Sequence, residues 1–296
     1  MPRHLDALTS STLKNLRAQW WDAQFSEFLH ETLKPRPGTR ILDVGCGDGT
    51  AEVSLGRSRI SQLRLFAVDR DLARVTRASL EGRSHNYRLG VAAADAETLP
   101  FVAGAFDATF CVAVLQHVKD VARAVGELAR VTRPGGRVLA VEPDNSARYW
   151  YSSSPAGADA FADASRFFAA AAAARGDATD PAVGPRLSAI FTDAGLEPLS
   201  VQLFPVSVTN IGSPARSVWT GRRDAVNREL ASTSDATVAA LGARYLGTLA
   251  RYEQEAAREG ATFVEIQNTM LFATVGHRAT AGTEAGSDAV KSRLAS

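Results

Sequence analysis

A glycine-rich turn between a predicted strand and a predicted helix carries the clearest chemical signal in the sequence. Residues 41–50 read Ile-Leu-Asp-Val-Gly-Cys-Gly-Asp-Gly-Thr. Because glycine has no Cβ atom, Gly45, Gly47 and Gly49 can adopt positive φ and let a ligand lie against the backbone. Amides at the start of the following helix can then donate to an acceptor group of that ligand. The stretch predicts a nucleotide-binding turn, and a tight turn that binds nothing is the simpler alternative.

An acidic residue, Asp43, stands inside the strand two residues before the first glycine. The Gly-x-Gly-x-Gly spacing also differs from the Gly-x-Gly-x-x-Gly of dinucleotide folds. A buried carboxylate beside the turn would repel a pyrophosphate. It could order the loop and face a cationic ligand, directly or through water.

A second acidic residue, Asp69, ends the next predicted strand, over residues 63–68. It follows the glycine turn by roughly 20 to 25 residues, which places it to accept hydrogen bonds from both ribose hydroxyls of an adenosine ligand. Nicotinamide dehydrogenases share such an acid, so Asp69 indicates adenosine and leaves the reaction open. Asp71 is expected to cap the following helix.

The motifs in this order resemble those of the class I S-adenosylmethionine-dependent methyltransferases. The first is the acidic residue followed by Gly-x-Gly-x-Gly. Residues 91–101, with Asp-Ala and a Leu-Pro-Phe turn, are similar to the third motif of that family, and residues 106–118 are similar to the fourth. The Arg-Pro-Gly-Gly-Arg turn at residues 133–137 is a frequent companion. The resemblance extends over about residues 38–144.

The resemblance implies S-adenosylmethionine as the cofactor, with contacts to its methionine end, its ribose, its adenine and the side near its methyl group. The residues implied for the methionine end are Asp43, Gly45, Cys46 and Gly47, and the residue implied for the ribose is Asp69. Those implied for the adenine are Arg70, Asp95 and Ala96, and those near the methyl group are Val112 and Gln116. Asp95 would accept from the adenine amino group. A hydrogen bond to its own loop is the ordinary role of such an aspartate and stays the alternative.

Methyl transfer from a sulfonium is an in-line displacement on the methyl carbon. Alignment and desolvation can supply roughly 7 to 11 kcal/mol of barrier reduction, so no covalent intermediate is required. A hydroxyl nucleophile would need a general base, and His117 is the candidate because it follows the fourth predicted strand. A histidine that packs or orders its loop is the alternative. Glu142, Asp144 and Tyr149 are further candidates.

Aromatic side chains outside the predicted core suggest an aromatic or amphiphilic acceptor. They are Trp20, Trp21, Tyr149, Trp150, Tyr151 and Trp219. The two adjacent tryptophans belong to a helix expected over residues 10–34, where they point about 100° apart, and a surface helix docked by one of them is the alternative. The three aromatic residues at 149–151 are expected at the exit of a fifth strand over residues 138–142, facing the ligand crevice.

The predicted fold is α/β, a doubly wound, Rossmann-like sheet of seven mostly parallel strands with an antiparallel last strand, plus helical lid and cap insertions. The expected segments are a helical lid (1–35), the cofactor-binding core (36–146), a helical cap (147–183), the core continued (184–208), a helical insertion (209–261), the last core strand (262–278) and a disordered tail (279–296). Leu241, Tyr245, Leu249 and Tyr252 recur at helical spacing in the insertion. This stripe predicts core packing or a subunit contact, which leaves room for a homodimer.

Composition favours an ordinary soluble, cytoplasmic protein. Of the 296 residues 45% are apolar, and the net charge of +1 gives no footprint for a nucleic acid backbone. Neither end has an apolar stretch of signal-peptide or membrane-spanning length. Cys46 and Cys111 have no neighbours that suggest a disulfide framework or a metal site. The expected partner is a small molecule, with no nucleic acid and no membrane.

Other functions remain open at this level. A nicotinamide-dependent oxidoreductase is disfavoured by the glycine spacing and by Asp43. A binding module could keep the cofactor fold without turnover, and a peptide acceptor stays open. The acceptor atom and the number of methyl groups transferred do not follow from the fold.

Overall fold

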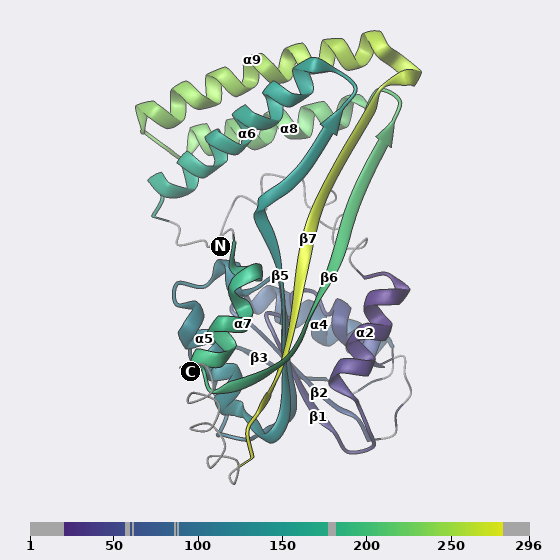
Figure 1. The fold of residues 1–296 in the computed structure, drawn as a ribbon, viewed down its shortest axis with the longest axis vertical. Coiled ribbons are helices and arrows are strands. Elements are labelled where there is room, and N and C mark those ends of the chain that lie inside the picture. Colours follow the sequence, from purple (N-terminus) through teal and green to yellow (C-terminus); the bar gives the residue numbers. More distant parts are fainter. Residues whose placement is uncertain are drawn as a thin grey trace, which may run out of the picture. The chain divides into compact units, whose positions relative to one another are not determined.

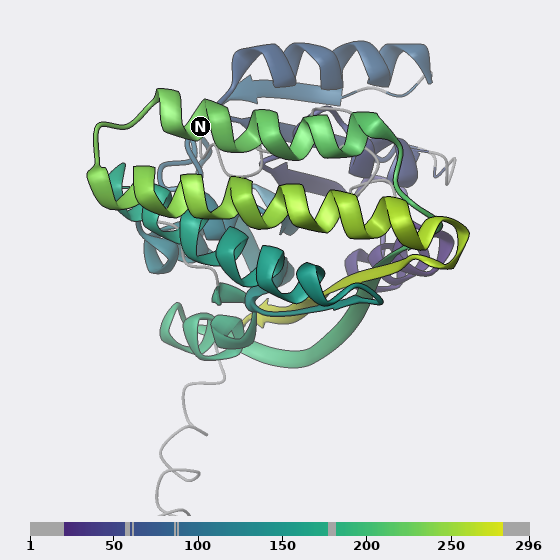
Figure 2. The same ribbon diagram turned by 90° about the horizontal axis from the view of Figure 1, so that it is seen from above.

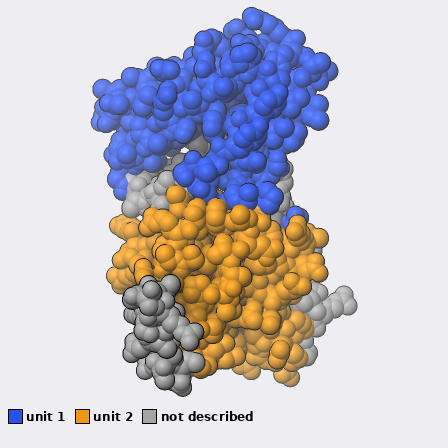
Figure 3. All heavy atoms as spheres, viewed as in Figure 1, with its two compact units in different colours: residues 1–22, 144–181, 205–270 blue, residues 23–143, 182–204, 271–296 orange. Residues whose placement is uncertain are grey.

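The computed structural model describes residues 21–56, 60, 62–85, 87, 89–176 and 182–280. The chain divides into two compact units, shown in Figure 3. Unit 1 comprises residues 1–22, 144–181 and 205–270, and unit 2 comprises residues 23–143, 182–204 and 271–296.

Seven strands of the described chain form one sheet in the order β3-β2-β1-β4-β5-β7-β6 (Figure 1). Their bounds are β1 Arg40–Val44, β2 Arg64–Asp69, β3 Leu89–Ala93, β4 Phe106–Val112, β5 Thr132–Ser152, β6 Leu196–Ile211 and β7 Val264–Arg278. From β3 to β5 neighbouring strands are parallel. Strand β7 is antiparallel to β5: Arg278 Nη1 donates to Thr132 O at 2.7 Å, and Ser153 N donates to Val264 O at 2.9 Å. The predicted fold class is confirmed.

Helices cover both faces of the sheet in unit 2. They are α2 Ala23–Leu33, α3 Thr50–Gly56, α4 Leu72–Ser84, the 3-10 helix η1 Leu115–His117, α5 Val121–Val131 and α7 Val183–Asp193. Leu42 of β1 packs in one cluster with Leu128 of α5 and Leu187 of α7. On the other face Ala67 of β2 packs with Ala78 of α4. This two-sided cover is why the strands are buried and apolar.

Three helices form a separate core in unit 1. They are α6 Pro155–Ala174, α8 Arg216–Ala231 and α9 Ala236–Glu259, which is followed by the 3-10 helix η2 Gly260–Thr262. Figure 2 shows α9 between α6 and α8. The Trp219 and Tyr252 rings meet edge to face, with centroids 5.2 Å apart. Tyr245, Leu249 and Tyr252 of the predicted stripe are buried in this core, so the stripe has a packing role.

The predicted N-terminal helix is too long. Helix α2 begins at Ala23, because Trp21 and Asp22 form a bend, and it ends before Lys34, whose φ is 46°. The earlier part of the prediction, with Trp20, lies outside the described residues. The same holds for the predicted tail, except for Ala279 and Thr280.

Strand β5 is much longer than predicted. It begins at Thr132 and ends at Ser152, so residues 147–152 belong to a strand and not to the predicted helical cap. The aromatic residues there favour extended structure, which explains the extension. The predicted turn at 133–137 interrupts the pairing of β5 with β4: Thr132 pairs with Phe106, the next pair joins Arg137 to Ala108, and Gly135 between them has a φ of 72°.

Candidate functional site

The glycine turn after β1 has the backbone that only glycine adopts readily. Gly45, Gly47 and Gly49 have φ values of 80°, 56° and 90°. A Cβ atom on Gly45 would lie 2.3 Å from Val114 Cγ2, so this glycine is required by packing. At Gly47 the only atom of the described residues within 4 Å of such a Cβ is Arg74 Nη1, at 3.9 Å. Gly47 therefore presents bare backbone to a ligand.

Asp69 ties this turn to the end of β2. Its Oδ2 accepts from Gly47 N at 3.1 Å, and its Oδ1 accepts from Asp71 N at 2.9 Å. Cys46 N donates to Val68 O at 3.0 Å. Each carboxylate oxygen has a second lone pair, so Asp69 can still accept from ribose hydroxyls. Its role in shaping the turn was not predicted from the sequence.

A buried pair of carboxyl groups lies beside the turn. Asp43 is 4% exposed, and Glu52, in the first turn of α3, is 1% exposed. Burial and the neighbouring Glu52 raise the pKa of Asp43, and burial raises the pKa of Glu52 to about 7. Among the described residues, both carboxyl oxygens of Glu52 are buried without a hydrogen-bond partner, and two neighbouring carboxyls of this kind titrate together. We call Asp43 and Glu52 the acid pair.

Glu52 was not predicted as a site residue. An acid in the first turn of a helix is ordinarily explained by the helix dipole, so its type and position gave no signal. The acid pair also acts on Cys46: burial, Asp43 and Glu52 raise the pKa of its thiol. Cys46 is therefore a protonated, buried thiol whose backbone shapes the turn.

A buried glutamate on β5 holds the loop that follows β4. Glu142 is fully buried, and its Oε1 accepts from Val114 N and from Leu115 N, both at 2.7 Å. Its Oε2 accepts from Gln116 N at 3.4 Å. Burial raises the pKa of Glu142 to about 7 against the opposing effect of these amides. The sequence marked Glu142 as a candidate base, and the structure gives it a positioning role.

Ala113 adopts a strained backbone at the start of the same loop. Its φ is 56°, and its N–H donates to Val141 O at 2.8 Å. Positive φ is disfavoured for residues with a Cβ, and such strain often marks functional sites.

Substitutions of Ala113 are expected to separate strain from packing. Ala113→Gly should change the free energy of opening of β4 by less than about 0.5 kcal/mol, because relief of strain offsets the added freedom of the unfolded chain. Ala113→Val should lower it by about 2 kcal/mol, since a β-branched residue tolerates positive φ poorly. Amide hydrogen exchange of the β4 peptide measures both changes in the free energy of opening. Equal changes for the two variants would contradict the claim that the backbone of Ala113 is strained.

The residues predicted to surround adenine lie at the ends of β2 and β3. Arg70 and Asp95 are exposed, and Ala96 is half-buried. Asp95 Oδ1 accepts from Glu97 N at 2.9 Å, and Thr98 N donates to Asp95 O at 3.0 Å. The local turn is thus present, and the adenine contact stays a prediction.

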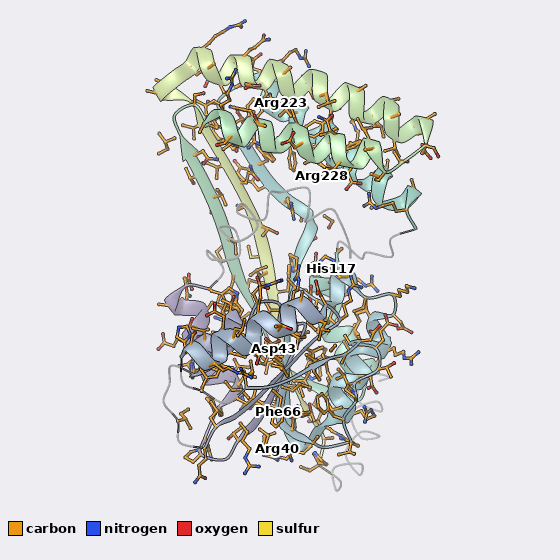
Figure 4. All side chains as sticks on the ribbon, turned by 180° about the vertical axis from the view of Figure 1, so that it is seen from behind. Arg40, Asp43, Phe66, His117, Arg223 and Arg228 are labelled. Carbon is orange, nitrogen blue, oxygen red and sulfur yellow. The ribbon has the colours of Figure 1, made fainter. Side chains whose placement is uncertain are left out.

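The residues predicted near the methyl group are grouped by β4 and η1. Val112 ends β4, and Gln116 is 4% exposed. His117 is half-buried, and its backbone N–H donates to Val114 O at 2.9 Å. In Figure 4, His117 and Arg40 lie at opposite ends of the unit 2 sheet, with Asp43 between them. This is the carboxyl end of the parallel strands, where doubly wound folds bind ligands. The base role of His117 stays a prediction.

The predicted acceptor residues do not form one cluster. Tyr149 and Tyr151 are 54% and 44% exposed. Because side chains alternate along a strand, Trp150 points to the other face, where its ring lies 4.7 Å from that of Phe161. Trp219 is 2% exposed inside unit 1. Trp21 is half-buried, and contacts of all these residues with an acceptor stay predictions.

The described residues contain neither a metal-binding cluster nor a membrane-spanning helix. No group of three or more His, Cys, Asp or Glu side chains there is arranged to hold a metal ion. Among the helices of that part, none is both long enough and apolar enough to cross a membrane.

Comparison with known proteins identifies the domain that carries this site. Residues 42–140 match the family described as methyltransferase domain. Together with the order of the sheet, this match confirms a domain of the class I S-adenosylmethionine-dependent methyltransferases.

Curated relatives match part of the chain. A ubiquinone biosynthesis O-methyltransferase of Thiobacillus denitrificans is 35% identical over 150 residues, which cover 46% of this chain and 62% of that protein. An O-methyltransferase of Pyrenophora dematioidea is 33% identical over 106 residues, covering 36% of this chain and 40% of that protein. The chain thus spans less than two thirds of the length of these relatives.

A solved structure supports the fold. The geranyl diphosphate C-methyltransferase of Streptomyces coelicolor, in complex with S-adenosyl-L-homocysteine, aligns with a TM-score of 0.50 and 15% identity. The alignment covers 90% of this chain and 83% of that one. At this identity the likeness shows the fold alone.

Proposed function

We propose that this protein transfers a methyl group from S-adenosylmethionine to a small organic acceptor. The observation that carries the proposal is the acid pair, Asp43 and Glu52, buried beside a glycine turn that Asp69 holds in place. Carboxyl groups at this point can ionise when a ligand with a cationic sulfonium and ammonium group arrives. The methyltransferase domain match over residues 42–140 supports the same cofactor.

The residues present fit this cofactor. Gly47 offers open backbone, and Asp69 keeps lone pairs for a ribose. When bound, the cofactor supplies an electrophilic methyl group. The protein's own part is then to orient the reactants and to exclude water.

The same site disfavours a nicotinamide cofactor. A pyrophosphate at the glycine turn would lie close to Asp43, Glu52 and Asp69, which all act electrostatically on Cys46 in that turn. Asp69, and either member of the acid pair when it is ionised, would repel the charge of the pyrophosphate. A binding module without turnover and a peptide acceptor are further alternatives, which turnover assays would test.

An oxygen nucleophile is the favoured acceptor atom, because the relatives above are named as O-methyltransferases. Such a nucleophile needs a base, and His117 is placed on the loop that Glu142 fixes. Glu142 acts through the loop amides and is not itself the base in this proposal.

Calorimetric titration of ligand-stripped protein tests the proposal directly. S-adenosylhomocysteine is expected to bind with a one-to-one stoichiometry, and NADH is expected to give no heat of binding. Binding of NADH, or of neither ligand by folded protein, would overturn the proposal.

A further inference from the structure

The carboxyl group of Glu52 is buried without a hydrogen-bond partner among the described residues. Glu52 is 1% exposed, and this holds for both of its carboxyl oxygens. Buried carboxyl groups are ordinarily paired or hydrogen-bonded, and exceptions are rare in native proteins. The other member of the acid pair, Asp43, is 4% exposed. Two neighbouring carboxyls buried in this way cannot both ionise at low cost, so the pair keeps a proton while no positive charge is near.

The groups that face the acid pair from other parts of unit 2 bring no positive charge. Asp69, at the end of β2, is a further acid and raises the pKa of Asp43. The Cys46 thiol in the glycine turn is protonated and neutral, because burial raises its pKa. The Tyr87 hydroxyl, after α4, is kept neutral by burial and by Glu52, which raise its pKa. An ordered water can donate to the oxygens of Glu52, but it brings no charge that would ionise the pair.

The cations on the neighbouring helices have partners elsewhere. On α4, Arg74 pairs with Asp71 at 3.8 Å, and Arg77 pairs with Asp48 at 2.9 Å. On α2, His30 Nε2 lies 3.3 Å from a backbone oxygen of α3. The pKa of Glu52 is set by burial, by Asp43 and by its own backbone. The charge of the acid pair is therefore left for a ligand.

The acid pair acts on the turn where a ligand would lie. Glu52 belongs to the first turn of α3, which follows Gly49 directly. Asp43 and Glu52 both raise the pKa of the Cys46 thiol, so their charges are felt inside the turn. Gly47, the next residue, presents bare backbone. A cation bound against this backbone would favour the ionised form of the pair.

We infer that Glu52 makes cofactor binding proton-linked: when a cationic ligand occupies the glycine turn, the acid pair releases one proton to the solvent. A carboxyl O–H bond breaks in this step, the proton passes to the buffer, and no other bond changes. Because the cation favours the ionised pair, its affinity rises as the pH rises. A neutral ligand leaves the proton in place. The inference rests on the proposed function, since it takes S-adenosylmethionine as the cation.

Proton release is measured by calorimetry of the ligand-stripped wild-type chain at pH 6.5. Titrations in phosphate and in imidazole, which differ in heat of ionisation, give the number of protons released per ligand bound. S-adenosylmethionine is expected to release about half a proton, if it lowers the pKa of the pair by about one unit from the value of about 7 for Glu52. The neutral thioether 5′-methylthioadenosine should release none. No release with S-adenosylmethionine, or equal release with the thioether, would overturn the inference.

Glu52→Gln locates the proton, because the amide has nearly the same size as the carboxyl group and does not ionise. The ratio of the wild-type affinity for S-adenosylmethionine to that of the variant should rise at least about fivefold between pH 5.5 and pH 7.5. Titration of the ligand's own groups is common to both proteins and cancels in this ratio. The matched control is Glu81→Gln on α4, where the side chain is 51% exposed, and its ratio should stay constant within about twofold. A constant ratio for Glu52→Gln would overturn the inference, and the proton release of the wild type decides if that variant does not fold.

The same titrations separate this inference from the proposed function. Binding of S-adenosylmethionine and S-adenosylhomocysteine without proton release refutes the proton linkage and leaves the proposed function intact. Failure of both ligands to bind the folded wild type refutes the proposed function, and the inference falls with it.

Discussion

Replacing Asp69 with alanine is expected to weaken S-adenosylhomocysteine binding at least about 100-fold. A hydrogen bond to a charged group contributes about 1.5–3 kcal/mol, and Asp69 is expected to accept from both ribose hydroxyls. The same substitution removes the acceptor of Gly47 N and of Asp71 N, so the glycine turn loses its anchor on β2. Calorimetric titration measures the loss.

The control for this prediction is Asp48→Ala in the same turn. Asp48 pairs with Arg77 at 2.9 Å, and its side chain is 64% exposed, so the pair contributes little. Its removal should change the affinity less than about threefold. If Asp69→Ala bound the ligand as tightly as Asp48→Ala, Asp69 would not be the ribose acceptor, and the cofactor assignment would lose its central residue.

The cofactor-binding half of the chain could be predicted because its signals are local. The positive φ of Gly45 and Gly47 follows a glycine spacing that is visible in the sequence, and Asp69 ends a strand that is recognisable from its own apolar residues. The strand order then follows from a fold that accepts few alternatives. A short motif therefore determined both the architecture and most of the cofactor contacts that we predict.

Contacts between distant segments could not be predicted in this way. Glu52 acts on the pKa of Asp43 although the two side chains come from different elements, α3 and β1, and nothing near either residue indicates the other. Arg222 and Glu265, which pair at 2.7 Å, are 43 positions apart in the sequence, and no local pattern indicates the pair. The aromatic residues at 149–151 were assigned to a crevice because β5 was expected to end early, and its extension places Trp150 and its neighbours on opposite faces.

The acid pair is expected to make unit 2 less stable as the pH rises from about 4.5 to 7. In the unfolded chain both carboxyls ionise near pH 4, whereas burial raises the pKa of Glu52 to about 7 and also raises that of Asp43. The native state thus binds more protons over this range, and the free energy of unfolding falls as they are lost. A shift of this size corresponds to about 3 kcal/mol.

Glu52→Gln tests this prediction, because the amide has nearly the same size as the carboxyl group and does not ionise. Relative to the wild type, the variant should gain about 3 kcal/mol at β1 between pH 5 and pH 8, measured by amide hydrogen exchange of the peptide that contains β1. The stability of the variant should still fall as the pH rises, but less steeply than that of the wild type. The remaining fall comes from Glu142, because burial raises its pKa to about 7 as well. Glu81→Gln on α4, where the side chain is 51% exposed, is the matched control and should follow the wild-type curve.

A wild-type stability that rises over this range would mean that the acid pair is ionised in the native protein and that negative charge beside the glycine turn is permanent. The predicted fall would mean that the pair holds a proton before a cationic ligand arrives, so that cofactor binding releases it.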